Sequence, residues 1–408
     1  MTSTSQRTRG PQPQRTPGGF PVVGIVGGGQ LARMCQPPAV ALGLTLSVLA
    51  ESPTASAALV VPHSPVGACD DLDAVVDFAR SCDVVTFDHE HVPGRVLHAV
   101  QAAGVSVHPD PSALRYAQDK IAMRDRLTQM GVPCPRWAVA REQQQVEDFG
   151  ARVGWPVVMK AARGGYDGKG VRVISASEEA QDWLARARTA RDGDGSPEGV
   201  LLEEKVDFRR ELAVLVARSP SGQAATWPVV QTVQQDGICT EVLAPAPGLT
   251  HQVATEATAA ALRIAGELEV TGVMAVEMFE LSAPGEPGFV VNELAMRPHN
   301  SGHWTIDGAV TSQFEQHLRA VLDLPLGATR ARDRWSVMAN VLGGSEPELY
   351  SAYRHLMARD PALRLHLYGK QVRPGRKIGH VNVGGSDLED LRARAGHAAD
   401  YLRGVVTR

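Results

Sequence analysis

Short apolar runs alternate with stretches of helical spacing over the first hundred residues, and this alternation is typical of a parallel α/β unit. Apolar strands are predicted at 22–26 and 44–49 and in the first half of 83–92. A glycine-rich turn follows the first strand, and a helix is predicted from about Leu31. Residues 21–115 are therefore predicted to form a Rossmann-like domain.

A helical connector is predicted between Pro109 and Pro135, with Ser112 as its N-cap. A second domain, at 116–315, is predicted to be built mainly from strands. A helix from Ser175, with Glu178 completing a capping box, and a helix at about 255–269 interrupt these strands. The predicted strands lie at 156–161, 171–174, 200–207, 211–217, 227–233, 273–280 and 290–293.

The last segment, 325–408, is predicted to form a small α+β domain. Its strands are predicted at 336–342, 364–368 and 377–383, and a final helix begins at Ser386, with Glu389 three residues on. Residues 1–20 contain no apolar residue except Met1 before Phe20. That composition cannot form a core and lacks the apolar region of a signal peptide, so it predicts a disordered tail.

Composition narrows the class of protein. The chain has 408 residues, is 43% hydrophobic and carries a formal net charge of −4, with a pI near 6.4. These values predict several globular domains, and they give no basic excess of the kind that nucleic-acid binding requires. No uncharged apolar run is long enough to span a bilayer. The five cysteines form no Cys-x-x-Cys pair, which favours reduced thiols in the cytoplasm over disulfides or zinc.

Two carboxylates at predicted strand positions indicate a metal site. Glu277 is flanked by apolar residues, and Glu293 ends the strand that begins at Val290. A carboxylate pair on neighbouring strands suits Mg²⁺, which is usually held by one or two carboxylates together with substrate phosphates. The alternative is that both acids cap strands or pair with arginine.

A glycine-rich loop follows the strand at 156–161. It places four glycines between Arg163 and Gly170, with Lys160 before the loop and Lys169 within it. Glycine lets backbone N–H groups approach a phosphate closely, and the lysines add positive charge. The spacing is not that of a Walker A motif. A flexible hairpin without charge chemistry is the alternative.

Polar residues gather after two other predicted strands. The loop beyond Glu293 carries Arg297, His299, Asn300, Ser301 and His303, and the strand at 83–92 ends in Asp88, His89, Glu90 and His91. Open α/β sheets bind ligands at the carboxyl ends of their strands, which places Glu90 at a site edge. Asp88, His89 and His91 could be metal ligands, but neighbours on a strand alternate between faces, so solvated polar groups are favoured.

A rival function rests on the first turn. Gly27, Gly29 and Ala32 satisfy the dinucleotide fingerprint, and Glu51 lies near the required distance downstream. These residues are compatible with an NAD-dependent enzyme, although any α/β unit with a tight first turn can show them.

The chain closely resembles the N5-carboxyaminoimidazole ribonucleotide synthetases, which are ATP-grasp enzymes of purine biosynthesis. The resemblance covers about residues 22–385. It is carried by Gly-Gln-Leu at 29–31, Arg-Gly-Gly-Tyr-Asp-Gly at 163–168, Gln-Asp-Gly-Ile at 235–238, Gly-Val-Met-Ala at 272–275, His-Asn-Ser-Gly-His-Trp at 299–304 and Arg-Pro-Gly-Arg-Lys at 373–377. One departure is Asp88-His89-Glu90, where the family usually has Glu-Phe-Glu, and it leaves His89 unexplained.

The resemblance implies an α/β and α+β protein with an ATP-grasp fold, an N-terminal Rossmann-like domain and a small C-terminal domain. It implies a ligase that uses ATP, bicarbonate and Mg²⁺ or Mn²⁺ to carboxylate 5-aminoimidazole ribonucleotide through carboxyphosphate, on the route to IMP. Another ATP-grasp carboxylase or ligase is the alternative. A cytoplasmic homodimer coupled to a downstream mutase is expected, with neither nucleic acid nor membrane as partner.

The resemblance also assigns residues. Catalysis is expected of Lys160, Tyr166, Asp167, Glu90, His299, Asn300 and Ser301. ATP is expected to contact Lys120, Lys160, Gly165, Gly168, Lys169, Gly170, Glu203, Glu204, Lys205, Val206, Glu211, Asn292 and Glu293. The ribonucleotide is expected to contact Gln30, Leu31, Glu90, His299, Asn300, Ser301, Gly302, His303 and the cations Lys370, Arg373, Arg376 and Lys377, which form a phosphate clamp. The metal is expected on Glu277 and Glu293.

Overall fold

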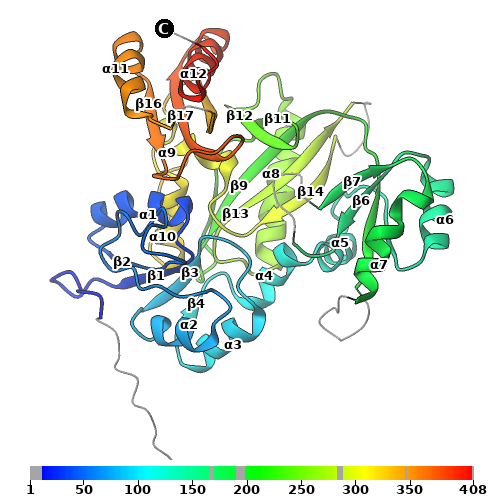
Figure 1. Cartoon of the computed structure of the whole chain (residues 1–408), viewed down its shortest axis with the longest axis horizontal. Coiled ribbons are helices and arrows are strands. Elements are labelled where there is room, and N and C mark those ends of the chain that lie inside the picture. Colours follow the sequence, from blue (N-terminus) through cyan, green and yellow to red (C-terminus); the bar gives the residue numbers. More distant parts are fainter. Residues whose placement is uncertain (1–11, 165–169, 190–197, 283–287, 345–346, 407–408) are drawn as a thin grey trace, which may run out of the picture.

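The computed structural model describes residues 12–164, 170–189, 198–282, 288–344 and 347–406 (Figure 1). The N-terminal region is a four-stranded parallel sheet of order β2-β1-β3-β4. Its strands are β1 (Val22–Val26), β2 (Thr45–Leu49), β3 (Val84–Phe87) and β4 (Ser106–Val107), with helices α1 (Gln30–Ala41), α2 (Leu72–Ala79) and α3 (Gly94–Ala102). This confirms the predicted parallel α/β unit.

Part of the expected disordered tail is attached to this sheet. Arg15 donates to the Asp83 carboxylate at 2.7 Å, and the Thr16 amide donates to the Thr45 hydroxyl at 3.3 Å. Asp83 also accepts from the Val22 amide at 2.7 Å, so one carboxylate joins the tail to the start of β1. The prediction of a disordered tail is therefore wrong for residues 12–20, and residues 1–11 lie outside the described part of the chain.

The connector is two helices, not one. α4 (Pro111–Gln118) begins after Asp110, whose carboxylate accepts from the Ser112 amide, so Asp110 is the N-cap and the expected Ser112 cap is wrong. α5 (Lys120–Gln129) begins after Asp119, which accepts from the amides of Ile121 and Ala122. Asp119 has extended backbone angles, and a carboxylate cap at that point starts a new helix.

A separate small sheet follows, of order β5-β8-β6-β7. It comprises β5 (Trp137–Ala140), β6 (Val157–Ala161), β7 (Val171–Ile174) and β8 (Val200–Glu204), and it packs against α6 (Gln143–Val153), the 3-10 turn η1 (Ser177–Ala180) and α7 (Gln181–Thr189). The capping box expected at Ser175 and Glu178 is wrong, because the Ser175 amide donates to Glu179 at 3.2 Å and the α-helix begins only at Gln181.

The largest element is a nine-stranded sheet of order β14-β13-β9-β11-β12-β15-β17-β16, with β10 paired to β9. Its strands are β9 (Phe208–Arg218), β10 (Ala224–Thr226), β11 (Val230–Gln235), β12 (Ile238–Ala244), β13 (Gly272–Leu281), β14 (Phe289–Ala295), β15 (Trp335–Leu342), β16 (Arg364–Leu367) and β17 (Lys377–Gly385). Alternate residues of β9 face opposite sides: Val214 packs with Ile264 of α8 (His251–Glu267), and Leu215 packs with Trp304.

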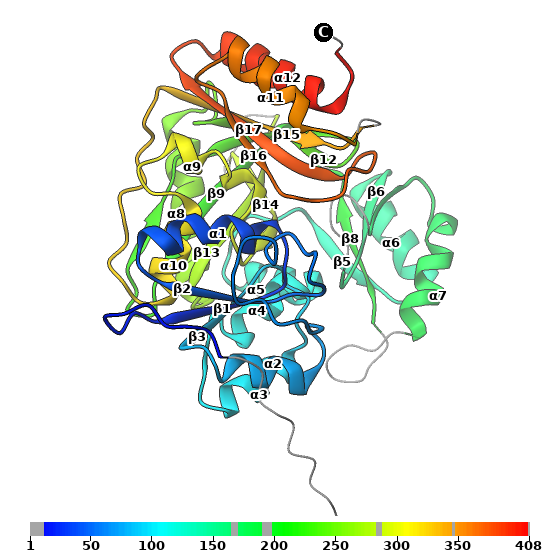
Figure 2. The ribbon, with the colours of Figure 1, turned by 60° about the vertical axis from the view of Figure 1, so that its left-hand side comes forward.

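The sheet does not break where a domain boundary was predicted near residue 325. β15 pairs antiparallel with β12 from Glu241↔Ala339 to Ala244↔Ser336, so the C-terminal strands extend the central sheet. Helices α11 (Tyr350–Arg359) and α12 (Leu388–Arg403) lie beside each other at the top of Figure 2, close to the C-terminus of the chain. α12 is capped by Asp387, which accepts from the amides of Glu389 and Asp390, so the predicted start at Ser386 is wrong. Across the described residues, every helix falls short of the length and apolar character that a bilayer-spanning segment needs.

A buried histidine joins the N-terminal sheet to the central one. His317, on α10 (Gln313–Val321), accepts from the Val273 amide at its Nδ1 at 3.0 Å and lies 2.8 Å from the Thr86 hydroxyl at its Nε2. Because Nδ1 accepts, the ring is neutral with its proton on Nε2. Burial, with a smaller effect of His108, lowers the pKa of His317 to about 3.

We expect this histidine to make the unfolding free energy fall in acid. An unfolded histidine takes up a proton near pH 6.5, whereas the folded ring does so only near its pKa of about 3. Stability is therefore lost as the pH falls below about 6.5, by up to ~1.4 kcal/mol per pH unit for this group. Urea unfolding at pH 7 and pH 5 should show a larger loss in the unmutated protein than in His317→Gln, and equal losses would contradict the assignment.

Two joined pockets as the candidate active site

The two expected metal carboxylates face each other across neighbouring strands. Glu277 of β13 is the direct register partner of Glu293 of β14, and the register shifts at the next position, where Met278 pairs with Val291. Asn292 is thus the extra residue of a β-bulge. A bulge lets successive side chains face one side of a sheet, and Asn292 and Glu293 both line the same pocket.

Each carboxylate has a basic neighbour. Glu277 lies 3.0 Å from Nε2 of His299, and Glu293 lies 3.7 Å from Nζ of Lys120. Burial opposes ionisation of Glu277, but the His299 hydrogen bond and charge outweigh it and hold the pKa of Glu277 below its usual value. Nearby Glu211 is less favoured as an anion, because burial and the Glu277 charge raise its pKa to about 7. Glu277 is therefore kept available as an anion for a cationic ligand, and Glu293 faces it in direct register.

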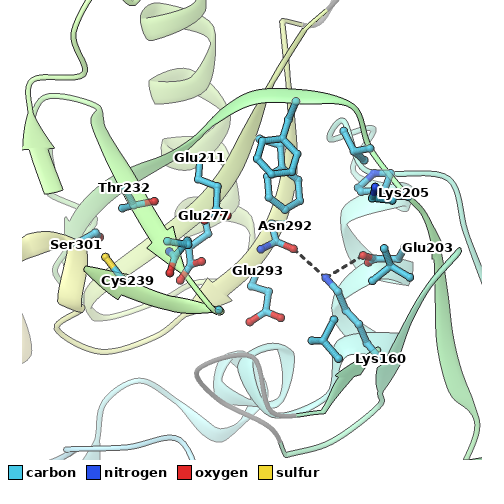
Figure 3. Close-up of a pocket in the computed structure, with 18 of the residues that line it drawn as sticks. Lys160, Glu203, Lys205, Glu211, Thr232, Cys239, Glu277, Asn292, Glu293 and Ser301 are labelled. Carbon is cyan, nitrogen blue, oxygen red and sulfur yellow. Dashed lines mark hydrogen bonds and ion pairs between the residues drawn. The ribbon is translucent and has the colours of Figure 1, made fainter. Parts of the chain in front are cut away.

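Lys160 is held between the two sheets. Its Nζ lies 2.8 Å from the Asn292 side-chain oxygen and 2.9 Å from Glu203, and Figure 3 shows it reaching between these groups, with Glu293 close by. Glu203 in turn accepts from Arg124 at 2.5 Å, and Arg124 donates to the Asn292 carbonyl at 2.6 Å. Burial raises the pKa of Glu203, but the charges of Arg124 and Lys160 reverse this effect and lower it. A charged network thus fixes the lysine at the end of β6.

The first pocket lies between the small sheet and the nine-stranded sheet. It has a volume of about 460 Å³, and the segment from Glu203 to Val206 forms one edge. Its apolar walls come from Val158, Val171, Val173, Phe208 and Phe279. Val171 and Val173 are two residues apart on β7, so both face the pocket, which explains why they are exposed. A flat aromatic base suits such walls, while Lys160 and the carboxylates lie at the far end.

The second pocket lies between the N-terminal sheet and the loop after β14. It has a volume of about 660 Å³ and is lined by Gln30, Leu31, Glu90 and Lys120 among others. Glu90 lies 2.7 Å from Nε of Arg297 and also accepts from the Met296 amide at 3.1 Å. Burial disfavours the Glu90 anion, yet the charge and hydrogen bond of Arg297 prevail and lower its pKa.

The two pockets share part of their walls. The residues that line both are Glu277, Glu293, His299, Asn300 and Lys377. Among the described residues, the amide nitrogen of Asn300 is buried and has no hydrogen-bond partner other than the weakly accepting sulfur of Cys239 beside it. A buried donor of this kind is costly unless a ligand accepts from it. The junction of the pockets therefore carries two carboxylates, a lysine and an unused donor within one small volume.

Some expected site residues are not assigned to either pocket. Gly165, Tyr166, Asp167, Gly168 and Lys169 fall outside the described residues, so their assignments stay predictions. Gly170 and Gly302 line neither pocket.

The expected phosphate clamp is only partly assembled. Lys377 lines both pockets, and Lys370 contacts the Gln30 side chain. Arg373 and Arg376 are exposed, and both are bonded to Gln371 instead. Lys120 lines the second pocket, not the first, and its side chain is only 14% exposed, so it is not a surface lysine.

The turn after β1 is unsuited to a dinucleotide. The Asp88 carboxylate occupies the N-terminus of α1, where it accepts from the Ala32 amide at 2.7 Å, and a Cβ on Gly29 would lie 1.9 Å from it. A pyrophosphate would bring further negative charge to this position. Glu51 turns back to accept from the Gly28 amide at 3.2 Å, and the unexplained His89 lies 3.8 Å from Glu51. These contacts argue against the NAD-dependent alternative.

The available side chains decide which of the two predicted metal sites fits the structure. Within the part of the chain that the structure describes, no group of three or more His, Cys, Asp or Glu side chains could hold an ion, which argues against Asp88, His89 and His91 as ligands. Glu277 and Glu293, with the side-chain oxygen of Asn292 beside them, offer hard oxygen donors only. That set fits Mg²⁺ or Mn²⁺ if substrate phosphates complete the coordination.

Sequence reasoning missed several residues of the site. Arg124 is fully buried, yet it stands in a helix with no motif around it. Arg297 was noticed in its loop but was given no partner, and the structure pairs it with Glu90. Thr232, Gln234 and Cys239 line the first pocket from β11 and β12. Period-2 spacing of Val171 and Val173 after the glycine-rich loop is the one signal that could have identified the apolar wall.

Three family models match consecutive parts of the chain. Residues 21–118 match a ribonucleotide synthetase preATP-grasp domain, residues 125–314 an ATP-grasp domain, and residues 336–394 a phosphoribosylaminoimidazole carboxylase C-terminal domain. The three models match the regions in the order in which the sequence predicts them. The ATP-grasp match ends at residue 314, before β15, and the C-terminal match begins at residue 336, within β15.

Relatives and solved structures agree with these matches. The chain is 54% identical to N5-carboxyaminoimidazole ribonucleotide synthase of Mycobacterium tuberculosis, covering 94% of this chain and 88% of the relative. It is 47% identical to the enzyme of that name from Corynebacterium ammoniagenes, covering 98% and 97%. The crystal structure of N5-carboxyaminoimidazole synthase from Aspergillus clavatus with ADP and 5-aminoimidazole ribonucleotide superposes with a TM-score of 0.82 at 30% identity, covering 94% and 98%.

Proposed function

The chain belongs to the N5-carboxyaminoimidazole ribonucleotide synthase family of ATP-grasp ligases, and from that premise we propose how its two pockets divide the reaction. ATP occupies the first pocket and 5-aminoimidazole ribonucleotide the second, and the carboxyl group is made and transferred at the wall they share. The enzyme thereby carboxylates the ribonucleotide at the expense of ATP in purine biosynthesis. The observation that carries this division is the set of five residues lining both pockets, Glu277, Glu293, His299, Asn300 and Lys377.

The first step joins bicarbonate to phosphate. A bicarbonate oxygen attacks the γ-phosphorus of ATP, the bond to ADP breaks, and carboxyphosphate forms. Mg²⁺ held by Glu277 and Glu293 would offset the negative charge of the phosphates. Lys160, fixed by Asn292 and Glu203, lies beside the same phosphates and neutralises charge that develops as the bond to ADP breaks.

The second step moves the carboxyl group to the amine. The amine of the ribonucleotide attacks carboxyphosphate, or the CO₂ it releases, a C–N bond forms, phosphate leaves, and the amine loses a proton. Asn300 supports this placement, because its buried amide nitrogen has no strong acceptor among the described residues and can donate to a carboxyl oxygen. His299 is proposed to take part in both steps, since its Nε2 contacts Glu277 and the residue lines both pockets. Tyr166 and Asp167, which lie outside the described residues, are proposed from the family resemblance to take part in catalysis.

The wider setting is proposed from the family. We expect a cytoplasmic homodimer whose product is consumed by a mutase acting downstream. The carboxylated amine is a carbamate, which loses CO₂ readily, so a following enzyme that moves the carboxyl group to carbon would preserve it.

The proposal is tested by measuring both products on one sample. The protein should release phosphate slowly with ATP, Mg²⁺ and bicarbonate, and the ribonucleotide should accelerate this release and yield carboxylated product in equal amount. Omitting bicarbonate should abolish both. Phosphate release that is independent of bicarbonate would contradict the reaction, and ribonucleotide-independent release at the full rate would contradict the shared wall.

Two adjacent cations provide a further prediction. Lys377→Met should weaken both ADP and ribonucleotide binding, each by about tenfold, because Lys377 lines both pockets. Arg376→Ala should weaken ribonucleotide binding alone, because its exposed guanidinium is available only to a phosphate that reaches the turn. Titration calorimetry with each ligand distinguishes the two variants. Equal effects of Arg376→Ala on both ligands would remove Arg376 from the clamp.

A further inference from the structure

The loop after β14 is folded around the amide of one buried glutamine. Gln313, the first residue of α10, is fully buried. Its Oε1 accepts from the His299 amide at 2.8 Å, and its Nε2 donates to the His299 carbonyl at 2.8 Å. The two contacts require oxygen on one side and nitrogen on the other, so they fix which way the Gln313 amide points.

The same amide reaches a second histidine. Nε2 of Gln313 lies 3.0 Å from Nδ1 of His303, which is also fully buried. Because the amide nitrogen can only donate, Nδ1 of His303 must accept. A neutral imidazole that accepts at Nδ1 carries its proton at Nε2. The tautomer of His303 therefore follows from the backbone of His299, through Gln313.

The proton that this places on His303 has no acceptor among the residues that the structure describes. His303 lines the second pocket, and its Nε2 is buried without a hydrogen-bond partner in the structure. An unpaired buried N–H costs free energy comparable to a lost hydrogen bond. A ligand in the second pocket that offers an oxygen or nitrogen acceptor would satisfy it.

The surroundings keep His303 neutral. His299 and Arg297 lie on the same loop, His366 is on β16 and Lys377 is on β17, so basic groups approach His303 from the loop and from two strands, while α10 packs Phe314 against its ring. Burial first, and then these basic groups, hold the pKa of His303 well below its usual value. An imidazolium is thus disfavoured, and the ring acts as a neutral donor.

We infer that Gln313 is a positioning residue that sets His303 as the Nε2–H tautomer, so that His303 donates a hydrogen bond to the ribonucleotide or to the carboxyl group transferred to it. The inference rests on the proposed function only for the identity of that ligand. The tautomer itself follows from contacts within the protein.

The chain contains a matched control. Gln316 lies one turn further along α10 and is likewise fully buried. It bonds the backbone of Gly327 in the same way, donating to the carbonyl at 2.8 Å and accepting from the amide at 2.7 Å. No histidine is bonded to it in the described structure. Gln316→Glu therefore reproduces the burial of a carboxylate beside a backbone carbonyl without touching a site residue.

The test reads the tautomer directly, by long-range ¹H–¹⁵N spectra of ¹⁵N-histidine-labelled full-length protein, with the His303 signals assigned from His303→Asn. The unmutated protein and Gln316→Glu should show His303 as Nε2–H between pH 6 and 8. Gln313→Glu should move the proton to Nδ1, because a carboxylate can only accept. If Gln313→Glu does not fold, Gln313→Met should show a mixture of both tautomers. An Nδ1–H or charged His303 in the unmutated protein would overturn the inference, as would an unchanged tautomer in a folded Gln313 variant.

Steady-state kinetics supply the functional readout. Gln313→Glu should raise KM for the ribonucleotide about tenfold, the effect of one lost hydrogen bond to a ligand. Gln316→Glu should leave this KM unchanged. Equal effects of the two variants on KM would overturn the positioning role. An unmutated protein that shows the Nε2–H tautomer but makes no carboxylated product would instead contradict the proposed function.

Discussion

Replacing Glu293 by glutamine should lower ATP turnover by about 10³-fold or more while the protein still folds. The change removes one negative charge and keeps the side chain's size. Glu293 faces Glu277 in direct register, so its loss leaves a single carboxylate to hold a divalent cation beside the phosphates. Preorganised charges at a phosphoryl group contribute about 10² to 10³ each to the rate. Mg²⁺-dependent phosphate release, with bicarbonate present, measures the effect.

A surface glutamate provides the control for this variant. Glu267 also lies near a cation, 3.5 Å from Arg126, but at an exposed position on α8. Glu267→Gln should leave turnover unchanged, and thermal melting of both variants should show that they remain folded. Turnover of Glu293→Gln near the unmutated rate would remove Glu293 from the metal site.

His299→Ala should uncouple ATP use from carboxylation. The sequence suggested that the loop lies beyond the metal carboxylates, but the structure places His299 3.0 Å from Glu277. Loss of the ring should therefore slow phosphate release by about tenfold through Glu277. Carboxylated product should fall a further ~100-fold, because a reactant misplaced by ~1 Å can lose that factor in rate. Phosphate and product measured together on one sample give the ratio.

The two products should respond differently to a neighbouring substitution. Ser301 lies 2.9 Å from the other ring nitrogen of His299 and is itself fully buried. Ser301→Ala removes that contact but leaves the His299 ring beside Glu277, so a smaller loss of coupling is expected than for His299→Ala. A parallel fall of phosphate and product in His299→Ala would assign this histidine to ATP chemistry alone.

Much of the fold and the centre of the site could be predicted because they depend on local patterns. Glu277 was identified because apolar residues flank it and Glu293 because it ends an apolar run, and strand pairing places the two side by side. Lys160 was identified because it stands near the end of a predicted strand, just before a glycine-rich loop. The shared wall of the pockets was reached from the sequence because three of its residues, His299, Asn300 and Glu293, stand within one short segment.

The missing parts depend on contacts between distant segments. Arg124 is 79 residues from its partner Glu203, and the helix around it gives no sign of that pairing. The bulge at Asn292 is a matter of register, which the sequence of one strand does not determine. Asp88 was taken for a solvated strand-end group, but the tight turn at Gly29 lets it bond the first turn of α1. The predicted caps at Ser112, Ser175 and Ser386 failed because Asp110, Glu179 and Asp387 offered competing carboxylates close by.

The pairing of β12 with β15 determines how the molecule can come apart. The segments matched by the ATP-grasp and C-terminal models share one hydrogen-bonded sheet. Neither segment can unfold without removing a paired strand from the other. Cooperative units in proteins follow such shared contacts and need not follow the limits of recurring sequence segments. Among the described residues, the four strands β5 to β8 share no ladder with that sheet and form a cluster of their own. Sequence comparison thus divides the chain into three segments. We expect local unfolding to follow a different division, in which the strands β5 to β8 can open separately from the rest of the molecule.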